Sequence, residues 1–368
     1  MEKIKTLFIL KIPPPVTGAT MMNEIIYNSK KIRNYFNSFY LPVSYKKKID
    51  TNILSFNRLV IFFSVVKRLI NNLIFVKPNL IYFQISPLGV AFLRDFIILL
   101  IAKIFKVPVL IHLRVYGIKN AINKSFIWKS LYTFAFKNNY IACHSEILAQ
   151  DFKEIFSGKY FIINNGIPDK FGTINHFDRS DNEHIRILFL SNFLKSKGVK
   201  DTFQIAENLI GKKINFQLFL VGNFTKYYTE KKLKKFIAKK KLNNYVQLIG
   251  PVADKEKHAY LRKSDIFIFP THYEAFGNVA IEAMQASLPV ISYKEGSLPI
   301  IISDKINGFL IDKGNIHDFT NKIQKLAKNP DLRKRMGYRG RKKYLELYTI
   351  EKFENNLKSI LKEISVTV

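Results

Sequence analysis

The chain is poor in cysteine and in acidic residues. Cys143 is the only cysteine among 368 residues, which excludes a disulfide framework and a metal site built from cysteines. A single thiol also fits a protein of the reducing cytosol. Lys and Arg number 59 against 28 Asp and Glu, so the formal net charge is +31, and the excess is spread over both halves of the sequence.

This positive charge admits three kinds of partner: nucleic acid, an anionic membrane surface, or small anionic substrates. A lysine-rich composition that simply covers the surface is the neutral explanation. The sequence has no zinc-finger spacing, no aromatic motif of the RNA-binding type and no basic heptad region. We therefore expect no nucleic acid among the partners.

Long apolar runs are also missing. The run 6–10 follows two lysines, as in a signal peptide, but Lys11 and three prolines stand where a cleavage site should be. A first strand is the better interpretation. Arg94, Asp95 and Lys103 interrupt residues 88–107, which predicts a buried or amphipathic helix. No transmembrane segment is expected.

What the sequence does contain is a regular alternation of apolar strands and amphipathic helices. The expected strands are 5–11, 39–42, 80–84, 107–113, 140–144 and 160–163, then 185–190, 216–221, 246–249, 266–269, 290–293 and 308–311. The expected helices are 21–29, 55–74, 90–105, 125–136, 146–155, 200–210, 226–240, 255–262, 316–327, 331–344 and 350–364. This alternation predicts parallel sheets with helices on both faces.

The predicted fold class is therefore α/β, with two doubly wound Rossmann-like domains facing a cleft. The N-terminal domain is expected over 1–172, and the polar stretch 173–183 is the expected linker. The C-terminal domain is expected over 184–345. A terminal helix over 346–368 is expected to pack back on the N-terminal domain. Ligand loops in such domains lie at the carboxyl ends of the strands.

The stretch 270–290, PTHYEAFGNVAIEAMQASLPV, is the most informative part of the chain. Glu274 lies in a polar turn after an apolar strand, Asn278 is the expected helix N-cap, and Glu282 lies in the helix. The amides of 277–279 at such a helix start suit an anion. Two interpretations are open: the carboxylates bind a ligand, or both are solvated surface groups.

The first half offers weaker candidates. Gly18 lies in the loop 13–18 between the first strand and the first helix, where glycine lets the backbone approach a ligand. His112 ends a predicted strand, and a structural role is the alternative there. The lysine triplet 46–48 and the predicted helix around Phe62 could face an anionic membrane.

At this point the residues resemble a known family. The pattern of two glutamates, Glu274 and Glu282, with Phe276-Gly277 between them and Ala283-Met284 after them is similar to that of family four (group one) glycosyltransferases. Further motifs carry the same resemblance: Leu288-Pro289-Val290, Gly296-x-x-Pro299, Asn307-Gly308-Phe309-Leu310, Phe189-Leu190-Ser191-Asn192, Lys197-Gly198-Val199 and Asn165-Gly166-Ile167.

The resemblance implies a GT-B fold, with the N-terminal domain on the acceptor side and the C-terminal domain binding the nucleotide sugar. It also implies transfer of a sugar from a nucleoside diphosphate donor, with retention at the anomeric carbon and without a metal or other cofactor. The expected partners are a UDP- or GDP-sugar and a glycan or lipid-linked acceptor. Cell-surface polysaccharide biosynthesis is the expected context, in the cytoplasm, with a peripheral position at the inner face of the membrane as its extension.

The resemblance also assigns roles. Lys197 would contact the donor phosphates, Glu282 the ribose hydroxyls, and Glu274 the sugar hydroxyls and the charge that develops on the ring. His112 would contact the sugar or the acceptor hydroxyl, and Gly18 would admit the donor phosphate. The expected catalytic residues are Glu274, His112 and Lys197, and the expected substrate-binding residues are Gly18, Asn192, Gly222, Val252, Phe276, Gly277, Asn278, Val279 and Glu282.

Several positions depart from the family pattern. Asn192 stands where an arginine is frequent, so one phosphate-binding charge is missing, and Lys195 is the nearest substitute. Ser297 and Ser287 replace frequent glycines, and Ile300 replaces a frequent glutamate. These departures bear on donor identity and affinity more than on activity.

Three alternatives stay open at this stage. A GT-B sugar-nucleotide epimerase or an inverting transferase would differ in the anomer of its product. A basic nucleic-acid-binding protein would show salt-dependent binding and no affinity for nucleotide sugars. A GT-B domain that binds without catalysis is the third. The lysine-rich segment 231–241 is expected to be a solvated helix face or a contact with anionic lipid.

Overall fold

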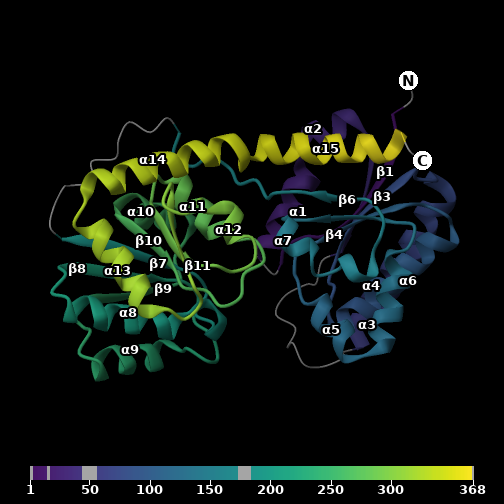
Figure 1. Ribbon diagram of the computed structural model, residues 1–368. Helices are drawn as coiled ribbons and strands as arrows, with labels where there is room; N and C mark the ends of the chain where they lie inside the picture. The colour runs from purple at the N-terminus through teal and green to yellow at the C-terminus, as the bar shows by residue number, and fades with distance from the viewer. Residues whose placement is uncertain (1–2, 15–16, 44–55, 173–183, 367–368) are drawn as a thin grey trace. The chain divides into compact units, whose positions relative to one another are not determined.

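The computed structural model describes residues 3–14, 17–43, 56–172 and 184–366 (Figure 1). The chain forms two compact units, one made of Met1–Gly166 with Ile350–Val368 and the other of Ile167–Thr349. The boundary thus precedes the predicted one at 172, because 167–172 pack with the second unit. The expected linker 173–183 and the lysine triplet 46–48 lie outside the described residues.

Unit 1 contains a six-stranded parallel sheet in the order β2-β1-β3-β4-β5-β6. Its strands are β1 (Lys5–Lys11), β2 (Asn37–Val43), β3 (Leu80–Ile85), β4 (Val109–Leu113), β5 (Tyr140–Cys143) and β6 (Tyr160–Ile162). Its helices are α1 (Gly18–Asn28), α2 (Lys30–Tyr35), α3 (Phe56–Asn71), the π-helix η1 (Asn72–Val76), α4 (Gly89–Ile104), α5 (Ile118–Lys124), α6 (Phe126–Phe136), α7 (Glu146–Ala149), the 3-10 helix η2 (Lys153–Ile155) and α15 (Ile350–Val366).

Alternate residues of each strand point to opposite faces of this sheet. Leu7 and Ile9 of β1 belong to the core beneath α3, α4 and α6. Phe8 and Leu10 belong to the core on the other face, with side chains of α1 and α2. Leu357 and other buried residues of α15 complete that second core. The last helix of the chain therefore packs as part of unit 1 (Figure 1).

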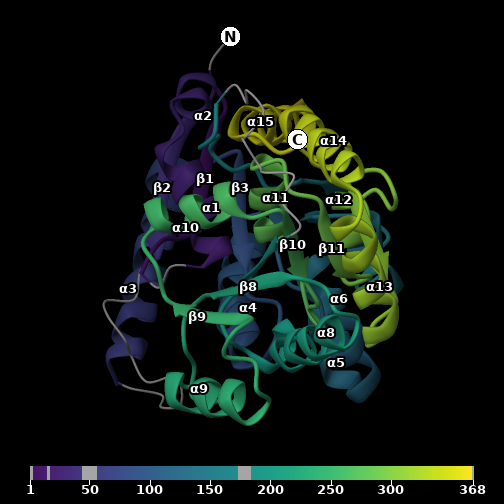
Figure 2. The same ribbon diagram turned by 90° about the vertical axis from the view of Figure 1, so that its left-hand side faces the viewer.

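Unit 2 contains a second six-stranded parallel sheet, in the order β12-β11-β10-β7-β8-β9. Figure 2 labels β8, β9, β10 and β11 of this sheet. Its strands are β7 (Ile185–Leu190), β8 (Phe216–Val221), β9 (Val246–Gly250), β10 (Ile266–Phe269), β11 (Val290–Tyr293) and β12 (Gly308–Ile311). Its helices are the 3-10 helix η3 (Lys195–Lys197), α8 (Val199–Gly211), α9 (Glu230–Lys239), α10 (Asp254–Lys263), α11 (Asn278–Gln285), α12 (Leu298–Ile301), α13 (Ile316–Ala327) and α14 (Pro330–Leu347).

This sheet is also covered on both faces. Ile187 and Phe189 of β7 lie in the core formed with α8, α9 and α13. Leu188 and Leu190 lie in the core formed with α10, α11, α12 and α14. Each unit is thus doubly wound, which confirms the predicted α/β class of two Rossmann-like domains. That their ligand loops face a common cleft stays a prediction.

The strand order places a switch point in each sheet, where neighbouring strands send their chains to opposite sides. In unit 1 it lies between β1 and β3, and in unit 2 between β7 and β10. Ligands of open α/β sheets bind outside the carboxyl ends of the strands at such points. In unit 2, the two loops at the switch point are 191–198 and 270–277, which carry the expected Lys197 and Glu274.

Some predicted helix limits were wrong. The expected helix 226–240 starts only at Glu230, because Thr229 caps it by accepting a hydrogen bond from the Lys232 amide. The expected helix 146–155 is broken into α7 and the 3-10 turn η2. The expected helix 55–74 continues as η1 and ends at Lys77, whose φ is 51°.

The interrupted apolar run 88–107 forms α4, and its acidic residue is buried. Asp95 lies 2.7 Å from the Lys11 amine and 2.7 Å from the Arg94 guanidinium. Burial lowers the pKa of Lys11 to about 8, although the charge of Asp95 opposes the shift. Among the described helices, none combines the length and the apolar character that crossing a membrane requires.

Candidate functional site

Lys197 and Glu274 meet at the switch point of unit 2. The Lys197 amine donates to Glu274 Oε2 at 2.9 Å and to the Tyr273 carbonyl at 2.9 Å. Gly198, with a φ of 72°, lets the first loop lie against the second, since a Cβ there would stand 1.8 Å from the Pro270 carbonyl oxygen. Both charged side chains keep 18% of their surface exposed, so a ligand can still reach the pair.

Side chains of neighbouring elements hold the two loops in register. The His272 amide donates to the Ser196 carbonyl at 2.7 Å. Asp201 of α8 lies 2.8 Å from His272 Nε2 and accepts a hydrogen bond from the Tyr293 hydroxyl at 2.7 Å. No pattern in the sequence predicts this triad, because its members come from α8, the loop after β10 and β11, and no spacing links them.

A third loop supports the backbone of Glu274. Gly296 has a φ of 52°, and a Cβ on it would stand 1.7 Å from the Glu274 carbonyl oxygen. The Ser297 amide donates to the Ala275 carbonyl at 3.2 Å, and the Ser297 side chain is fully buried. The glycine is therefore required at 296, whereas serine is accommodated at 297.

Among the described residues, only one of the two carboxylate oxygens of Glu282 in α11 has a hydrogen-bond partner. Its Oε1 lies 3.0 Å from the amine of Lys257, which also pairs with Asp254 at 3.0 Å. Its Oε2 is buried and has no hydrogen-bond partner within the described residues. Burial lowers the pKa of Lys257, but the charges of Glu282 and Asp254 outweigh it and raise that pKa overall. The charged Lys257 thus pairs with one oxygen of Glu282 and leaves the other oxygen to accept from a ligand.

The start of α11 differs from the prediction. Gly277, with a φ of 108°, is the N-cap residue and supplies no side-chain cap, whereas Asn278 is the first helical residue. The prediction that Asn278 caps the helix was wrong, because only glycine adopts this left-handed φ without strain. Val279 is partly buried against the core of unit 2, and Phe276 is buried there with its ring 6.2 Å from that of Tyr348. Any ligand contact of Phe276 would involve its backbone.

Asn192 occupies the loop after β7, and its Oδ1 accepts from Asn223 Nδ2 at 2.9 Å. Lys195, the expected substitute for the missing arginine, has its amine 5.1 Å from the ring centroid of Tyr227. A cation over an aromatic face is held there by electrostatic attraction. In this structure the Lys195 amine therefore lies over the Tyr227 ring.

The remaining two expected contacts of unit 2 come from the loops after β8 and β9. Gly222 has a φ of 152°, and a Cβ on it would stand 1.9 Å from the Ser191 carbonyl oxygen. Its amide donates to the Gly250 carbonyl at 2.8 Å. Val252 is partly buried against the core of unit 2. Ser191, Gly222 and Gly250 therefore form one contiguous edge of backbone beside Asn192.

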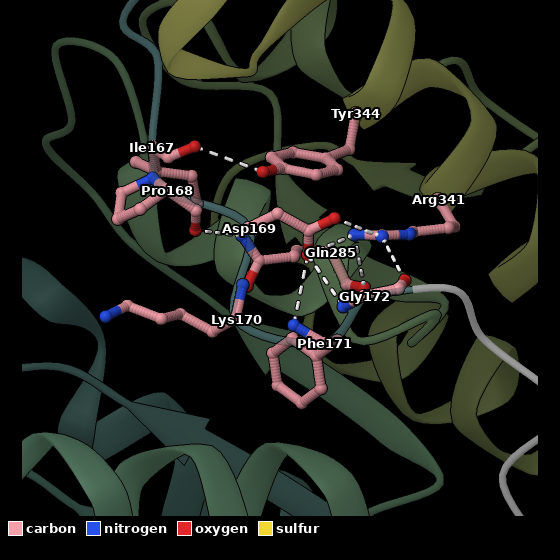
Figure 3. A network of polar contacts seen from close by, with 9 residues as sticks. All are labelled: Ile167, Pro168, Asp169, Lys170, Phe171, Gly172, Gln285, Arg341 and Tyr344. Carbon is pink, nitrogen blue, oxygen red and sulfur yellow. Dashed lines mark hydrogen bonds and ion pairs between the residues drawn. The ribbon is translucent and has the colours of Figure 1, made fainter.

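The segment 167–172 is fastened to unit 2 by side chains of α11 and α14 (Figure 3). Arg341 donates to the Asp169 carboxylate at 2.9 Å and to the Gly172 carbonyl at 2.6 Å. Gln285, on the helix that carries Glu282, donates to the Pro168 carbonyl at 2.7 Å and accepts from the Lys170 amide at 3.2 Å. This network ties the entry of the chain into unit 2 to α11.

In unit 1, Gly18 is the exposed first residue of α1, which Thr17 caps by accepting from the Thr20 amide at 3.1 Å. His112 of β4 is completely buried, with Nδ1 2.6 Å from the Tyr82 hydroxyl. Its Nε2 has no partner within the described residues. Burial, reinforced by the charge of Arg114, holds the pKa of His112 well below its usual range, so its ring is neutral at pH 7.

His144 beside it is also buried and neutral, and burial lowers its pKa to about 3. Below pH 6.5 the unfolded chain takes up a proton on each histidine that the folded chain does not, so both groups stabilise the fold above that pH and lose this effect as pH falls. We expect His144→Gln to reduce the loss of unfolding free energy between pH 6.5 and 5.5 by about 1 kcal/mol.

Urea denaturation at several pH values measures this loss. His317→Gln, which changes an exposed histidine of α13, is the matched control and should lose as much stability as the wild type. An unchanged pH dependence in His144→Gln would show that His144 titrates in the folded protein.

Residues 173–343, which make up most of unit 2, match the family described as Glycosyl transferases group 1. Residues 173–343 therefore form a group 1 glycosyltransferase domain. The family pattern recognised in the sequence is thus confirmed for the unit that holds Lys197, Glu274 and Glu282.

Two relatives illustrate the family. An uncharacterized glycosyltransferase of Methanocaldococcus jannaschii is 31% identical over 248 residues, or 67% of this chain and 65% of the relative. The capsular polysaccharide biosynthesis glycosyltransferase CapM of Staphylococcus aureus is 28% identical over 211 residues, or 56% of this chain and 52% of the relative. The chain therefore spans between half and two thirds of the length of these relatives.

Solved structures agree with the fold of both units. HepE of Anabaena, in complex with UDP, superimposes with a TM-score of 0.77 at 17% identity, covering 98% of this chain and 100% of HepE. At that identity the likeness concerns the fold alone. It confirms the predicted GT-B architecture of two Rossmann-like domains.

Proposed function

We propose that the protein is a retaining glycosyltransferase that moves a sugar from a UDP- or GDP-sugar to a hydroxyl of a glycan or lipid-linked acceptor. The observation that carries this proposal is the pair Lys197–Glu274 at the switch point of unit 2, with the unpartnered Oε2 of Glu282 on the helix that follows. The Lys197 amine suits a diphosphate, the Glu282 carboxylate suits a ribose, and the Glu274 carboxylate suits a sugar.

The donor would be held by groups of unit 2. Lys197 supplies positive charge for the diphosphate, and the amides at the start of α11 add hydrogen-bond donors. Glu282 Oε2 accepts from a ribose hydroxyl, because a buried carboxylate oxygen without a partner gains most from one. Glu274 lies beside Lys197 and accepts from sugar hydroxyls.

For the reaction, we propose a same-face substitution without a metal. The bond between the anomeric carbon and the phosphate oxygen breaks, and the acceptor oxygen forms a new bond to that carbon on the same face. The departing phosphate oxygen takes the acceptor's proton. Glu274 stabilises the positive charge on the ring, and Lys197 the negative charge on the leaving group. His112, neutral at pH 7, would contact the sugar or the acceptor hydroxyl through Nε2.

Relatives support the donor and the context. A solved structure of HepE contains UDP-glucose, a nucleoside diphosphate sugar. CapM is named for capsular polysaccharide biosynthesis. We extend this context to the present chain and propose that it works in cell-surface polysaccharide biosynthesis, on the cytoplasmic side.

A thermal-shift panel of UDP-, GDP- and ADP-sugars tests the donor. A donor present at a hundred times its dissociation constant stabilises the fold by about 2.7 kcal/mol. The anomeric configuration of the product, read by NMR, then tests retention. An inverted product would contradict the proposed mechanism, and no shift with any nucleotide sugar would contradict the donor class.

We also propose that unit 1 rests on an anionic membrane. α3, α4 and α6 cover one face of its sheet, and six large apolar side chains on these helices and on η1 are at least 65% exposed. They are Phe63, Phe75, Val90, Ile104, Phe126 and Ile127. Basic residues lie on the same helices or just beyond them, including Lys67, Arg68, Lys103, Lys106, Lys124, Lys129 and Lys137. Exposed apolar groups with basic neighbours match the surface of an anionic bilayer.

Flotation of the protein with vesicles measures this contact. We expect binding to vesicles that contain phosphatidylglycerol and much weaker binding to phosphatidylcholine alone. Replacing Phe126 and Ile127 together with serine should weaken binding about tenfold or more, since each buried side chain contributes about 1.5–3 kcal/mol. Tyr338→Ser, at a 62% exposed position of α14 in unit 2, is the control. Equal flotation of the double variant and the wild type would contradict this surface.

A further inference from the structure

Arg114 follows β4 directly and is buried, with 5% of its surface exposed. Its Nη1 donates to Asn165 Oδ1 at 2.6 Å. Its Nε and Nη2 are inaccessible and have no hydrogen-bond partner within the described residues. A buried guanidinium with two unused N–H groups is costly, so such a group indicates a function.

The two unused nitrogens are the pair that binds oxyanions. In Arg186 of unit 2 the same atoms, Nε and Nη2, each lie 3.1 Å from a different oxygen of the Asp265 carboxylate. This planar fork matches two oxygens of a carboxylate or a phosphate. In Arg114 the fork is complete, but the described part of the chain places no carboxylate on it.

The described neighbours of Arg114 do not neutralise it. The guanidinium acts to lower the pKa of the Tyr82 hydroxyl, but burial raises that pKa more, so the hydroxyl stays uncharged. The positive charge lowers the pKa of His112 and of His144, after the larger effect of burial, so both rings stay neutral. The Asp151 carboxylate, on the same unit, accepts from the amides of 117–119. Within the described ranges of the chain, no carboxylate therefore compensates the charge of Arg114.

The position of Arg114 is that of a ligand-binding residue. It lies two residues after His112, at the carboxyl edge of the sheet of unit 1, where open α/β sheets bind their ligands. The groups proposed to hold the donor diphosphate lie in unit 2. We propose that the Nε–Nη2 fork of Arg114 binds a carboxylate or phosphate group of the acceptor, an inference that rests on the proposed function.

Inorganic phosphate and malonate are the probes, at ionic strength matched with chloride. The measurements use the Lys197→Ala background, so that the proposed diphosphate site of unit 2 does not respond. We expect one or both anions to raise the melting temperature by several degrees, and Arg114→Met to abolish that shift. Arg114→Lys should not restore it, because an amine lacks the fork. Arg339→Met, at an exposed position of α14, should keep it.

Stability without added anion separates this role from a structural one. If the Arg114 fork binds a ligand and does not stabilise the free protein, Arg114→Met should melt at the same temperature as its parent or higher. The reason is that the substitution removes an uncompensated buried charge. A lower melting temperature together with an unchanged response to both anions would overturn the proposal. A comparison of the melting-temperature shifts caused by phosphate and by malonate shows which oxyanion the fork prefers.

The last measurement is the shift in melting temperature that UDP causes in the protein with Lys197 intact. An unchanged UDP shift in Arg114→Met supports binding on the acceptor side, and a lost shift would overturn that assignment. A wild-type protein that responds to no nucleotide, while Arg114 still mediates the anion response, would contradict the proposed function and leave the anion site standing.

Discussion

Glu274→Gln is expected to lower sugar-transfer turnover by about 10²- to 10³-fold while the protein stays folded. The change removes the carboxylate that lies 2.9 Å from the Lys197 amine and that would stabilise the positive charge on the sugar ring. Glutamine keeps the size of the side chain, so the loops of unit 2 have no steric reason to move.

Release of the nucleoside diphosphate from the donor identified by thermal shift measures this turnover. Glu346→Gln is the matched control, because Glu346 forms an exposed pair with Lys342 on α14 at 3.9 Å and should turn over normally. If Glu274→Gln kept its turnover within a factor of about two, Glu274 could not have the catalytic role proposed here.

Gly296→Ala is expected to have the largest effect on stability, about 3 kcal/mol or more. The residue has a φ of 52°, and its Cβ would stand 1.7 Å from the Glu274 carbonyl oxygen, so the backbone of the site must shift. Gly314→Ala is the matched control, because Gly314 has a φ of 81° and no atom within 4 Å of a Cβ. It should lose about 1 kcal/mol from backbone strain alone.

Urea denaturation of both variants separates steric overlap from strain. Donor affinity should fall in Gly296→Ala and stay unchanged in Gly314→Ala, since only the first displaces Glu274. Equal losses of stability in the two variants would contradict the tight contact between 296 and 274.

The sheets could be predicted well because their strands are short apolar runs bounded by polar turns. β7, β10 and β11 begin and end as the sequence indicates. β2 extends one residue beyond Pro42, which a strand tolerates here because β2 is the edge of its sheet and pairs only with β1. Short helices such as α2, α5 and α12 were missed, since fewer than eight residues show no clear helical period.

The two glutamates and Lys197 could be recognised from local pattern, and the groups around them could not. Lys257 is one of three lysines on α10, and only packing brings its amine 3.0 Å from Glu282. Arg114 carries no motif, and its significance lies in two nitrogens that have no hydrogen-bond partner in the part of the chain that the structure describes. Ser287 ends α11 with a φ of 55°, a conformation that the frequent glycine would adopt without strain.

The most direct test of the central claim is calorimetric titration of UDP and GDP into the wild type, Glu282→Gln and Lys197→Ala. We predict that one nucleotide binds the wild type at one site and that each substitution weakens it about tenfold or more, because each removes a hydrogen bond to a charged group. Glu346→Gln should bind as the wild type does. Equal affinity in all four proteins, or no binding of either nucleotide to the wild type, would contradict the account.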